Sequence, residues 1–247
     1  MQQTRQDDAN AKLFEFCPGL GELLVSRQTV GKSGKVFSDV AALSTRNNLL
    51  TLHRLFVETK PERTLEIGLS FGGSALLFTS EHQALGRSPA AQHMALDPFQ
   101  ETVWDSTGIM AVERAGLGGY LDFRSAFSAF ELPRLVEQGD RFDLVYVDGS
   151  HLFEDAFVDA YFVTRLLSKG GIVAFDDSST KDVGKVIRFI RSNMRTSLEE
   201  VDLLPYRDDS TAALPYRLAR HLGKIQLTAF RRVGPAVREW NAQFVDF

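Results

Sequence analysis

Three aspartates follow apolar runs that are typical of buried strands. The run FDLVYV leads to Asp148, and the run GGIVAF leads to Asp176 and Asp177. The spacing between Asp148 and Asp176 leaves room for one helical crossover between neighbouring parallel strands. Since α/β proteins bind ligands at the carboxyl ends of such strands, we expect the three carboxylates to share one corner of that edge.

Carboxylates held this close repel one another unless one is protonated or a cation lies between them. Oxygen ligands favour a hard ion, so Asp148, Asp176 and Asp177 predict a site for Mg²⁺, with Mn²⁺ or Ca²⁺ as alternatives. A structural role is also open, in which one Asp caps a helix and another bonds to loop amides. His151, which follows in DGSH, could remove a proton near neutral pH or simply cap the next helix.

A glycine-rich turn stands earlier in the chain, between a strand-like run and a helical pattern. The stretch EIGLSFGGS contains Glu66, Gly68, Gly72 and Ser74. Such a turn lets a ligand approach the main chain closely at a helix N-terminus. Ser70 stands where a dinucleotide site has its second glycine, which weakens an NAD interpretation. A tight turn without any ligand is the structural alternative.

Polar residues also end the next two strand-like runs. Asp97 ends the run HMAL, where its carboxylate could accept hydrogen bonds from two ribose hydroxyls or cap the turn before Pro98. Ser128 follows the third run and could contact an adenine or be an ordinary loop serine. The stretch GKS at 31–33 lacks the preceding glycine of a phosphate-binding P-loop, so we set that motif aside.

Composition limits the function classes. The chain has 247 residues, is 44% hydrophobic and carries a net charge of −4, so we expect one globular domain without a general attraction for nucleic acid. The single Cys17 excludes a disulfide framework and a cysteine metal cluster. The start is polar, and no apolar run approaches the ~20 residues that span a bilayer. We therefore expect a cytoplasmic protein that does not bind membranes.

Strand-like and helix-like segments alternate through the middle of the chain. Apolar strands are predicted at 63–68, 93–97, 121–124, 142–148 and 171–176, and helices at 74–85, 100–115, 130–138 and 153–168. Such alternation predicts a parallel sheet covered on both faces. The fold class is therefore α/β, a doubly wound, Rossmann-like, mostly parallel seven-stranded sheet with one antiparallel strand near the C-terminus.

The two ends of the chain differ from this middle part. Residues 1–37 are irregular, and a helix capped by Ser38 or Ser44 runs to about Lys60. After a helix at 181–194, the runs EEVDLLPY and KIQLTAFRRV predict two strands without a clear helix between them.

Two groups of motifs resemble those of known enzymes. E-x-G-x-x-x-G-x-S is similar to motif I of class I S-adenosylmethionine-dependent methyltransferases. YVDGSH, a helix and then LSKGGIVAFDD resemble the metal-dependent O-methyltransferases that include catechol and macrolide-sugar enzymes. The resemblance covers about residues 45–180 and implies S-adenosylmethionine and a divalent metal, Mg²⁺, as cofactors. It also implies a small-molecule acceptor whose hydroxyl is methylated.

The resemblance assigns roles to residues of this chain. The cofactor would be held by Glu66, Gly68, Ser70, Gly72, Ser74, Asp97, Ser128 and Asp148, the metal by Asp148, Asp176 and Asp177, and His151 and Asp148 would be catalytic. Catechol-type members have a Lys where this chain has His151, so the acceptor stays open. We expect one methyltransferase domain over 1–247, with an N-terminal cap or lid at 1–40, a core at 45–180 and a C-terminal helix and strand pair at 181–247.

Three other functions stay open. The first is a metal-free class I methyltransferase whose acidic cluster is structural. The second is a non-catalytic module that binds a nucleotide or a sugar-nucleotide, and the third is a dehydrogenase. A homodimer is one further expectation, because Trp240, Phe244 and Phe247 near the C-terminus could pack on a partner subunit.

Overall fold

The protein has the α/β architecture that its alternating segments predict. The computed structural model describes residues 15–208 and 210–247, so the first 14 residues of the expected N-terminal cap lie outside the described part. The main sheet has seven strands in the order β5-β4-β3-β6-β7-β9-β8. Their bounds are β3 Thr64–Ile67, β4 His93–Leu96, β5 Leu121–Arg124, β6 Phe142–Val147, β7 Leu167–Phe175, β8 Leu198–Glu200 and β9 Thr228–Arg232. β9 pairs antiparallel with both β7 and β8, which confirms a mostly parallel sheet with one reversed strand.

The chain divides into two compact units. One comprises Met1–Lys60 and Leu69–Ser125, and the other comprises Pro61–Gly68 and Ala126–Phe247. We call them the first and the second unit and describe each by itself. The expectation of one domain over 1–247 stays a prediction.

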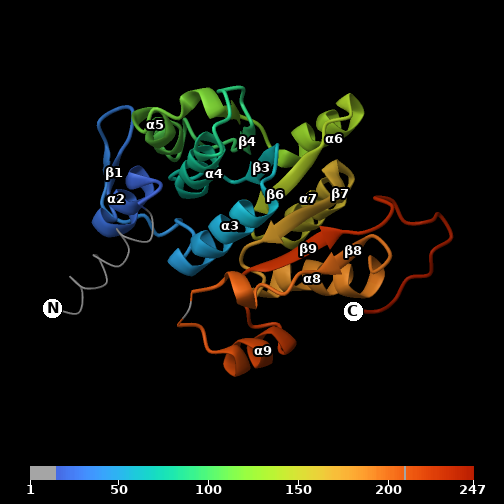
Figure 1. The fold of residues 1–247 in the computed structure, drawn as a ribbon. Helices are drawn as coiled ribbons and strands as arrows, with labels where there is room; N and C mark the ends of the chain where they lie inside the picture. Colours follow the sequence, from blue (N-terminus) through green and yellow to red (C-terminus); the bar gives the residue numbers. More distant parts are fainter. Residues whose placement is uncertain (1–14, 209) are drawn as a thin grey trace. The chain divides into compact units, whose positions relative to one another are not determined.

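The first unit contains the parallel pair β4–β5 and most of the early helices. Its elements are α2 Pro18–Ser26, β1 Thr29–Val30, β2 Val36–Phe37, α3 Arg46–Thr59, α4 Gly73–Ala84, α5 Thr107–Arg114 and the short 3₁₀ turn η1 Gly118–Tyr120. α4 is buried from its first residue to His82, so it is a core helix. Figure 1 shows these elements in blue to green.

Three expectations for the first unit are corrected. The irregular N-terminal segment contains α2 and the β1–β2 hairpin. The cap of α3 is Thr45, whose side chain accepts a hydrogen bond from Asn48 N, rather than Ser38 or Ser44. The helix expected at 100–115 is confined to α5, because Asp105 and Ser106 have positive φ angles of 48° and 58° that end any continuous helix before them.

The second unit contains the strands on which the acidic residues lie. β6 pairs in parallel with β3 and β7, and its last four residues are fully or almost fully buried, as in the middle of a covered sheet. The helices are α6 Ser128–Gln138, α7 Phe153–Leu166, α8 Lys181–Asn193 and α9 Ala213–His221, with a 3₁₀ turn η2 Leu204–Tyr206. β7 begins at Leu167 rather than at 171, because a register shift opposite Phe142 and Leu144 accommodates the extra residues.

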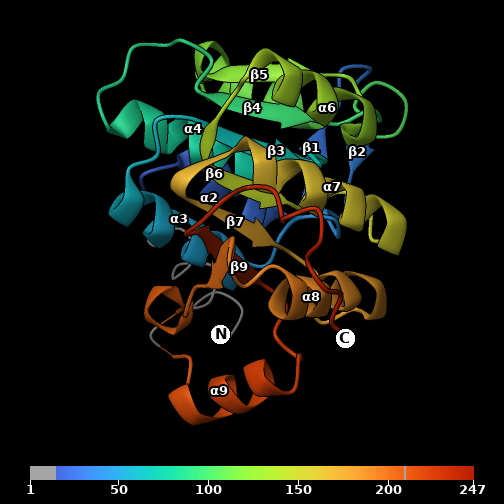
Figure 2. The same cartoon turned by 90° about the vertical axis from the view of Figure 1, so that its right-hand side faces the viewer.

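α9 is a further element that the sequence did not predict. It lies between β8 and β9, and Figures 1 and 2 both show it set apart from the strands. Pro215 suggests a break, yet it is the third residue of the helix, where no intrahelical N–H bond is needed. Leu214 and Leu218 on α9, and Leu222 directly after it, are exposed, so these leucines form no buried stripe.

The C-terminal tail returns to α8 (Figure 2). Asn193 donates to Val245 O at 2.7 Å and accepts from Val245 N at 2.9 Å. The rings of Phe244 and Phe247 lie 6.5 and 5.4 Å from that of Phe189 on α8. The homodimer through this tail stays a prediction. Among the described residues, none of the helices is long and apolar enough to cross a membrane.

Candidate active site at the ends of β6 and β7

The acidic residues of the second unit follow strands that pair in register. Asp148 N donates to Ile67 O at 2.9 Å, and Asp176 N donates to Val147 O at 3.0 Å. The ladder therefore continues one residue beyond the three strand ends, and Gly68, Asp148 and Asp176 form one row across them. This row is the expected corner at the carboxyl edge of the sheet.

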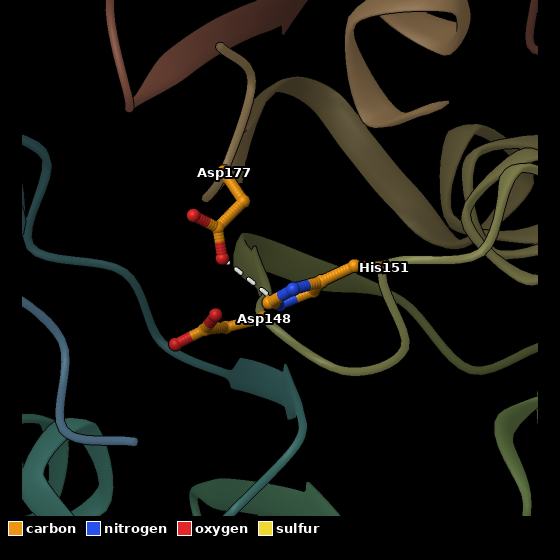
Figure 3. Close-up of side chains that lie close together, drawn as sticks. All are labelled: Asp148, His151 and Asp177. Carbon is orange, nitrogen blue, oxygen red and sulfur yellow. Dashed lines mark ion pairs between the residues drawn. The ribbon is translucent and has the colours of Figure 1, made fainter. Parts of the chain in front are cut away.

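Three side chains converge just beyond that row. Asp148, His151 and Asp177 each offer one metal-ligating atom, and these atoms all lie within 4.8 Å of one another. Figure 3 shows Asp148 and His151 coming from the loop after β6, and Asp177 from the loop after β7. His151 Nε2 lies 2.9 Å from Asp177 Oδ2, with side-chain exposures of 54% and 25%. The cluster is therefore open to solvent and within reach of a ligand.

The ion pair shifts the pKa values of both His151 and Asp177. The hydrogen bond to Asp177 raises the pKa of His151 above its ordinary value, against a smaller opposing effect of burial. The nearby charges of Asp177, Asp148 and Asp176 raise the His151 pKa further. The same hydrogen bond from His151 lowers the pKa of Asp177, again against the effect of burial. The folded chain thus stabilises an imidazolium next to an ionised carboxylate.

The backbone of Asp177 is held in an unusual conformation. Its φ angle is +50°, in the left-handed region that a non-glycine residue adopts only at a cost of about 1–2 kcal/mol. Thr180 holds it there, since Thr180 N and Oγ1 both donate to Asp177 O, at 2.9 and 2.8 Å. This strained turn directs the Asp177 side chain towards His151.

Asp176 lies in a different environment from its two expected partners. It is 4% exposed, its Oδ2 accepts a hydrogen bond from Tyr146 Oη, and its Oδ1 accepts one from Asp177 N at 2.8 Å. The three side chains that could hold a metal ion include His151 in place of Asp176, which the sequence predicts as a ligand. Tyr146, which the sequence analysis did not single out, belongs to this part of the site.

The glycines of the early turn are explained by close backbone approaches. Gly68 has φ +95°, and a Cβ on it would lie 2.1 Å from Asp148 O within the second unit. Gly72 has φ +82°, and a Cβ on it would lie 2.7 Å from Gly108 O within the first unit. Both positions therefore require glycine for the fold itself, whatever ligand the turn binds.

In the first unit, the turn at Ser70 is tied to Asp97. Ser70 has φ +46°, and its N donates to Asp97 Oδ2 at 2.9 Å. Gln100 Nε2 donates to Ser70 O at 2.7 Å and to Asp97 Oδ2 at 3.0 Å, and Phe99 N donates to Asp97 Oδ1 at 2.7 Å. Asp97 therefore organises the loop, and the ribose contact expected of it stays a prediction. The sequence analysis missed Gln100, whose Oε1 also accepts a hydrogen bond from Gly108 N at 3.2 Å.

The other expected cofactor residues lie at the ends of regular elements. Glu66 is fully buried on β3, and Ser74 is 5% exposed in the first turn of α4. Ser128 is the first residue of α6 and forms a side-chain hydrogen bond with Asp159 of α7. Burial raises the pKa of Asp159 to about 7. The adenine contact of Ser128 stays a prediction.

The GKS stretch binds a carboxylate of the chain itself. Asp105 Oδ2 accepts hydrogen bonds from Ser33 N at 3.1 Å and from Ser33 Oγ at 2.6 Å, and Asp105 O accepts one from Lys32 N at 2.8 Å. A Cβ on Gly31 would lie 2.2 Å from Asp105 Oδ2. The turn of the β1–β2 hairpin is thus fastened to the loop before α5.

Part of the chain matches a known protein family. Residues 65–178 match the model of a family described as a methyltransferase domain. Among curated proteins, no match to this sequence is found.

Solved structures of the same fold cover most of the chain. The O-methyltransferase TomG from Streptomyces achromogenes, in complex with SAM, is 16% identical with a TM-score of 0.60 and covers 95% of this chain and 100% of its own. An O-methyltransferase from Bacillus cereus, in complex with SAH, is 15% identical with a TM-score of 0.54, and covers 78% and 82%. Cofactor-bound Rv0187 from MTB is 17% identical with a TM-score of 0.57, and covers 78% and 83%. At these identities the likeness establishes the fold.

The strand order, the reversed β9 and the glycine turn that follows β3 belong to a doubly wound α/β fold, which the chain shares with these O-methyltransferase structures. Residues 65–178 match a methyltransferase domain, and the chain resembles O-methyltransferases of the same fold that are solved with SAM or SAH, which confirms the resemblance read from its motifs.

Proposed function

We propose that this methyltransferase transfers a methyl group from S-adenosylmethionine to a hydroxyl of a small molecule, assisted by a divalent metal ion. The observation that carries the proposal is the convergence of Asp148, His151 and Asp177 beyond the carboxyl ends of two parallel strands. S-adenosylmethionine as donor and oxygen as acceptor are supported by the two O-methyltransferase structures of the same fold.

The donor atoms fit a divalent cation. Two carboxylates and one imidazole within 4.8 Å suit Mn²⁺ or Mg²⁺, and Asp148 and Asp177 supply the hard oxygen ligands. A metal ion bound there supplies Lewis-acid chemistry, which lowers the pKa of a hydroxyl group. Asp176, which accepts a hydrogen bond from Asp177 N, would either position Asp177 or act as a further metal ligand. The acceptor could be a sugar, a catechol or another natural product.

The cofactor would be held by residues at the glycine turn and near the ends of the strands. S-adenosylmethionine supplies a methyl group on a cationic sulfur. Because the molecule has no phosphate groups, its binding site needs no phosphate-binding loop. Its proposed contacts are Glu66, Gly68, Ser70, Gly72, Ser74, Asp97, Ser128 and Asp148. The main-chain turn at Ser70 is preorganised for such contacts by Asp97 and Gln100.

The chain's own groups handle the proton. His151, with Asp148 as the second candidate, takes the proton from the acceptor hydroxyl. Asp177 orients the imidazole through the 2.9 Å contact at Nε2 and stabilises the imidazolium that results. His151 also belongs to the metal-ligating group, so it acts as a base or as a ligand, and these roles separate by experiment.

One observation favours a metal-free version of the same enzyme. The ion pair between His151 and Asp177, together with the hydrogen bonds of Tyr146, already offsets part of the negative charge at the strand ends. In that version His151 would act as the base and the aspartates would only position it.

Titration with Mn²⁺, monitored by the electron paramagnetic resonance signal of the ion, tests whether the site binds a metal. We expect the wild type to bind one ion and Asp177→Asn to bind it at least about tenfold more weakly, because a charged ligand is lost. Glu154→Gln, which changes an exposed carboxylate on α7, is the control and should bind like the wild type. Absence of Mn²⁺ binding by the wild type would favour the metal-free version.

The variant His151→Ala distinguishes a role of His151 as the catalytic base from a role as a metal ligand. A lost base lowers kcat by about 10²-fold or more with unchanged Mn²⁺ affinity. A lost ligand weakens Mn²⁺ binding as well. His221→Ala, at the exposed end of α9, is the matched control and should change neither quantity.

A further inference from the structure

The phenol of Tyr146 lies inside the sheet of the second unit. Tyr146 is 0% exposed and lies on β6, two residues before Asp148, so the two side chains project from the same face of the strand. In the strand register it stands opposite Glu66 of β3 and Ala174 of β7. The small Ala174 leaves the neighbouring position on that face free of a bulky side chain.

Its hydroxyl lies between two of the carboxylates. Tyr146 Oη is 3.1 Å from Asp148 Oδ2 and is also within hydrogen-bond distance of Asp176 Oδ2. A phenol has one hydrogen to donate, so it can serve only one of the two carboxylates at a time. Two ionised carboxylates around one hydroxyl are favourable only if a further proton or a cation is close by.

The contacts continue from Asp176 to the cluster. Asp176 Oδ1 accepts a hydrogen bond from Asp177 N at 2.8 Å, in the turn where Asp177 has its strained φ angle. Tyr146 thus contacts Asp148 directly and reaches Asp177 through Asp176. Those two aspartates are the oxygen donors of the metal-ligating group.

We propose that Tyr146 is a positioning residue that fixes the carboxylates of Asp148 and Asp176, and through them the metal-binding geometry. The inference rests on the proposed metal-assisted function. When the hydroxyl donates to Asp148, it restrains rotation of that carboxylate, so Oδ2 is held inward and the other oxygen is left for the metal. Without the hydroxyl, the Asp148 carboxylate gains rotational freedom. The metal ligands are then less preorganised, and metal affinity falls.

Tyr146→Phe tests the proposal because it removes the hydroxyl and keeps the ring. We expect its affinity for Mn²⁺, measured by electron paramagnetic resonance, to fall about tenfold or more, in line with the loss of a group that orients ligands. Its affinity for S-adenosylhomocysteine, measured by calorimetry, should stay within about twofold, since the proposed effect acts on metal ligands.

Tyr120→Phe is the matched control. Tyr120 is 5% exposed in the first unit, and its Oη donates to Arg87 O at 2.8 Å, so this variant also loses a buried phenol hydrogen bond. It should bind Mn²⁺ like the wild type. All three proteins are titrated at a temperature at which circular dichroism shows them folded, which separates a loss of metal affinity from a loss of structure.

Equal Mn²⁺ affinity of the wild type and Tyr146→Phe would overturn the inference and leave the proposed function intact. A parallel loss in Tyr120→Phe would also overturn it, because the effect would then be general weakening of the fold. Failure of the wild type to bind Mn²⁺ would contradict the metal-assisted function and the inference together.

Discussion

Gly68 is the residue at which the glycine turn and the acidic corner meet in the second unit. Its φ angle of +95° and the 2.1 Å approach of an added Cβ to Asp148 O both exclude a side chain. We predict that Gly68→Ala lowers the free energy of unfolding by about 4 kcal/mol, because backbone strain and a backbone clash add. Urea denaturation followed by circular dichroism measures this.

Gly86→Ala is the matched control for Gly68→Ala. Gly86 also has a positive φ, +70°, but among the described residues nothing lies within 4 Å of the added Cβ. Only the conformational penalty of about 1 kcal/mol should remain. Equal losses in the two variants would mean that the contact with Asp148 does not require glycine.

Single residues could be predicted where a motif fixed their place, and were missed where the partner is distant in sequence. Asp148 and Asp177 follow from two strand ends, and both lie in the cluster. Tyr146 looked like one more apolar strand residue, because its hydroxyl is engaged only when β7 brings Asp176 beside it. Gln100 likewise gains its role only through the fold of the Ser70 turn.

At the scale of elements, the β1–β2 hairpin is fastened by Asp105. The carboxylate of Asp105 holds Ser33 of the hairpin turn, while Arg114 on α5 donates to Val30 O at 3.1 Å. Phe37 at the end of β2 packs edge-on against Phe71 of the glycine turn, at 5.5 Å between ring centroids. The hairpin therefore reaches the loop proposed to bind the cofactor.

We predict that Asp105→Ala increases amide hydrogen exchange throughout residues 29–37 and lowers stability by about 1–3 kcal/mol, since Ser33 loses its acceptor and Ala disfavours a positive φ. Asp105→Asn keeps one acceptor oxygen and a residue that tolerates the left-handed region, so its effect should be smaller. If Asp105→Ala left exchange in the hairpin unchanged, the carboxylate would not be what fastens it.

Regular elements were predictable where local pattern and tertiary packing agree. β6 and α7 lie close to their expected bounds because apolar runs mark buried strands and faces. α9 was missed because its leucines are exposed and Pro215 lies in its first turn, so neither burial nor a breaker rule identified it. The helix expected from residue 100 failed because Asp105 and Ser106 adopt positive φ angles for tertiary reasons.

At the scale of the whole molecule, the buried side chains of His82 and Asp159 make the free energy of unfolding depend on pH in opposite directions. Burial, together with the charges of His93 and Arg87, lowers the pKa of His82 to about 3. Between about pH 6.5 and pH 3, His82 is therefore protonated in the unfolded chain but neutral in the folded chain. The free energy of unfolding falls as pH falls through this range. Asp159 has its pKa raised to about 7, so stability falls as pH rises from about 4 to 7.

We predict that Asp159→Asn stabilises the protein increasingly as pH rises. The gain over the wild type should be small near pH 4 and level off above pH 7, at about 2–4 kcal/mol, because the neutral amide replaces a buried carboxylate that must ionise. Urea denaturation at several pH values measures it. Glu154→Gln, an exposed change on the same helix, should show no such trend, and a flat difference for Asp159→Asn would contradict the assignment.

The central claim is that this chain binds S-adenosylmethionine as a methyl donor. The most direct test is calorimetric titration of the purified protein with S-adenosylhomocysteine, with Mg²⁺ and again after EDTA. We predict saturable binding at one site per chain in the presence of Mg²⁺. The EDTA arm then shows whether the ion contributes to cofactor binding. Absence of binding in both conditions would contradict the claim and favour a nucleotide-sugar or a dinucleotide as the ligand.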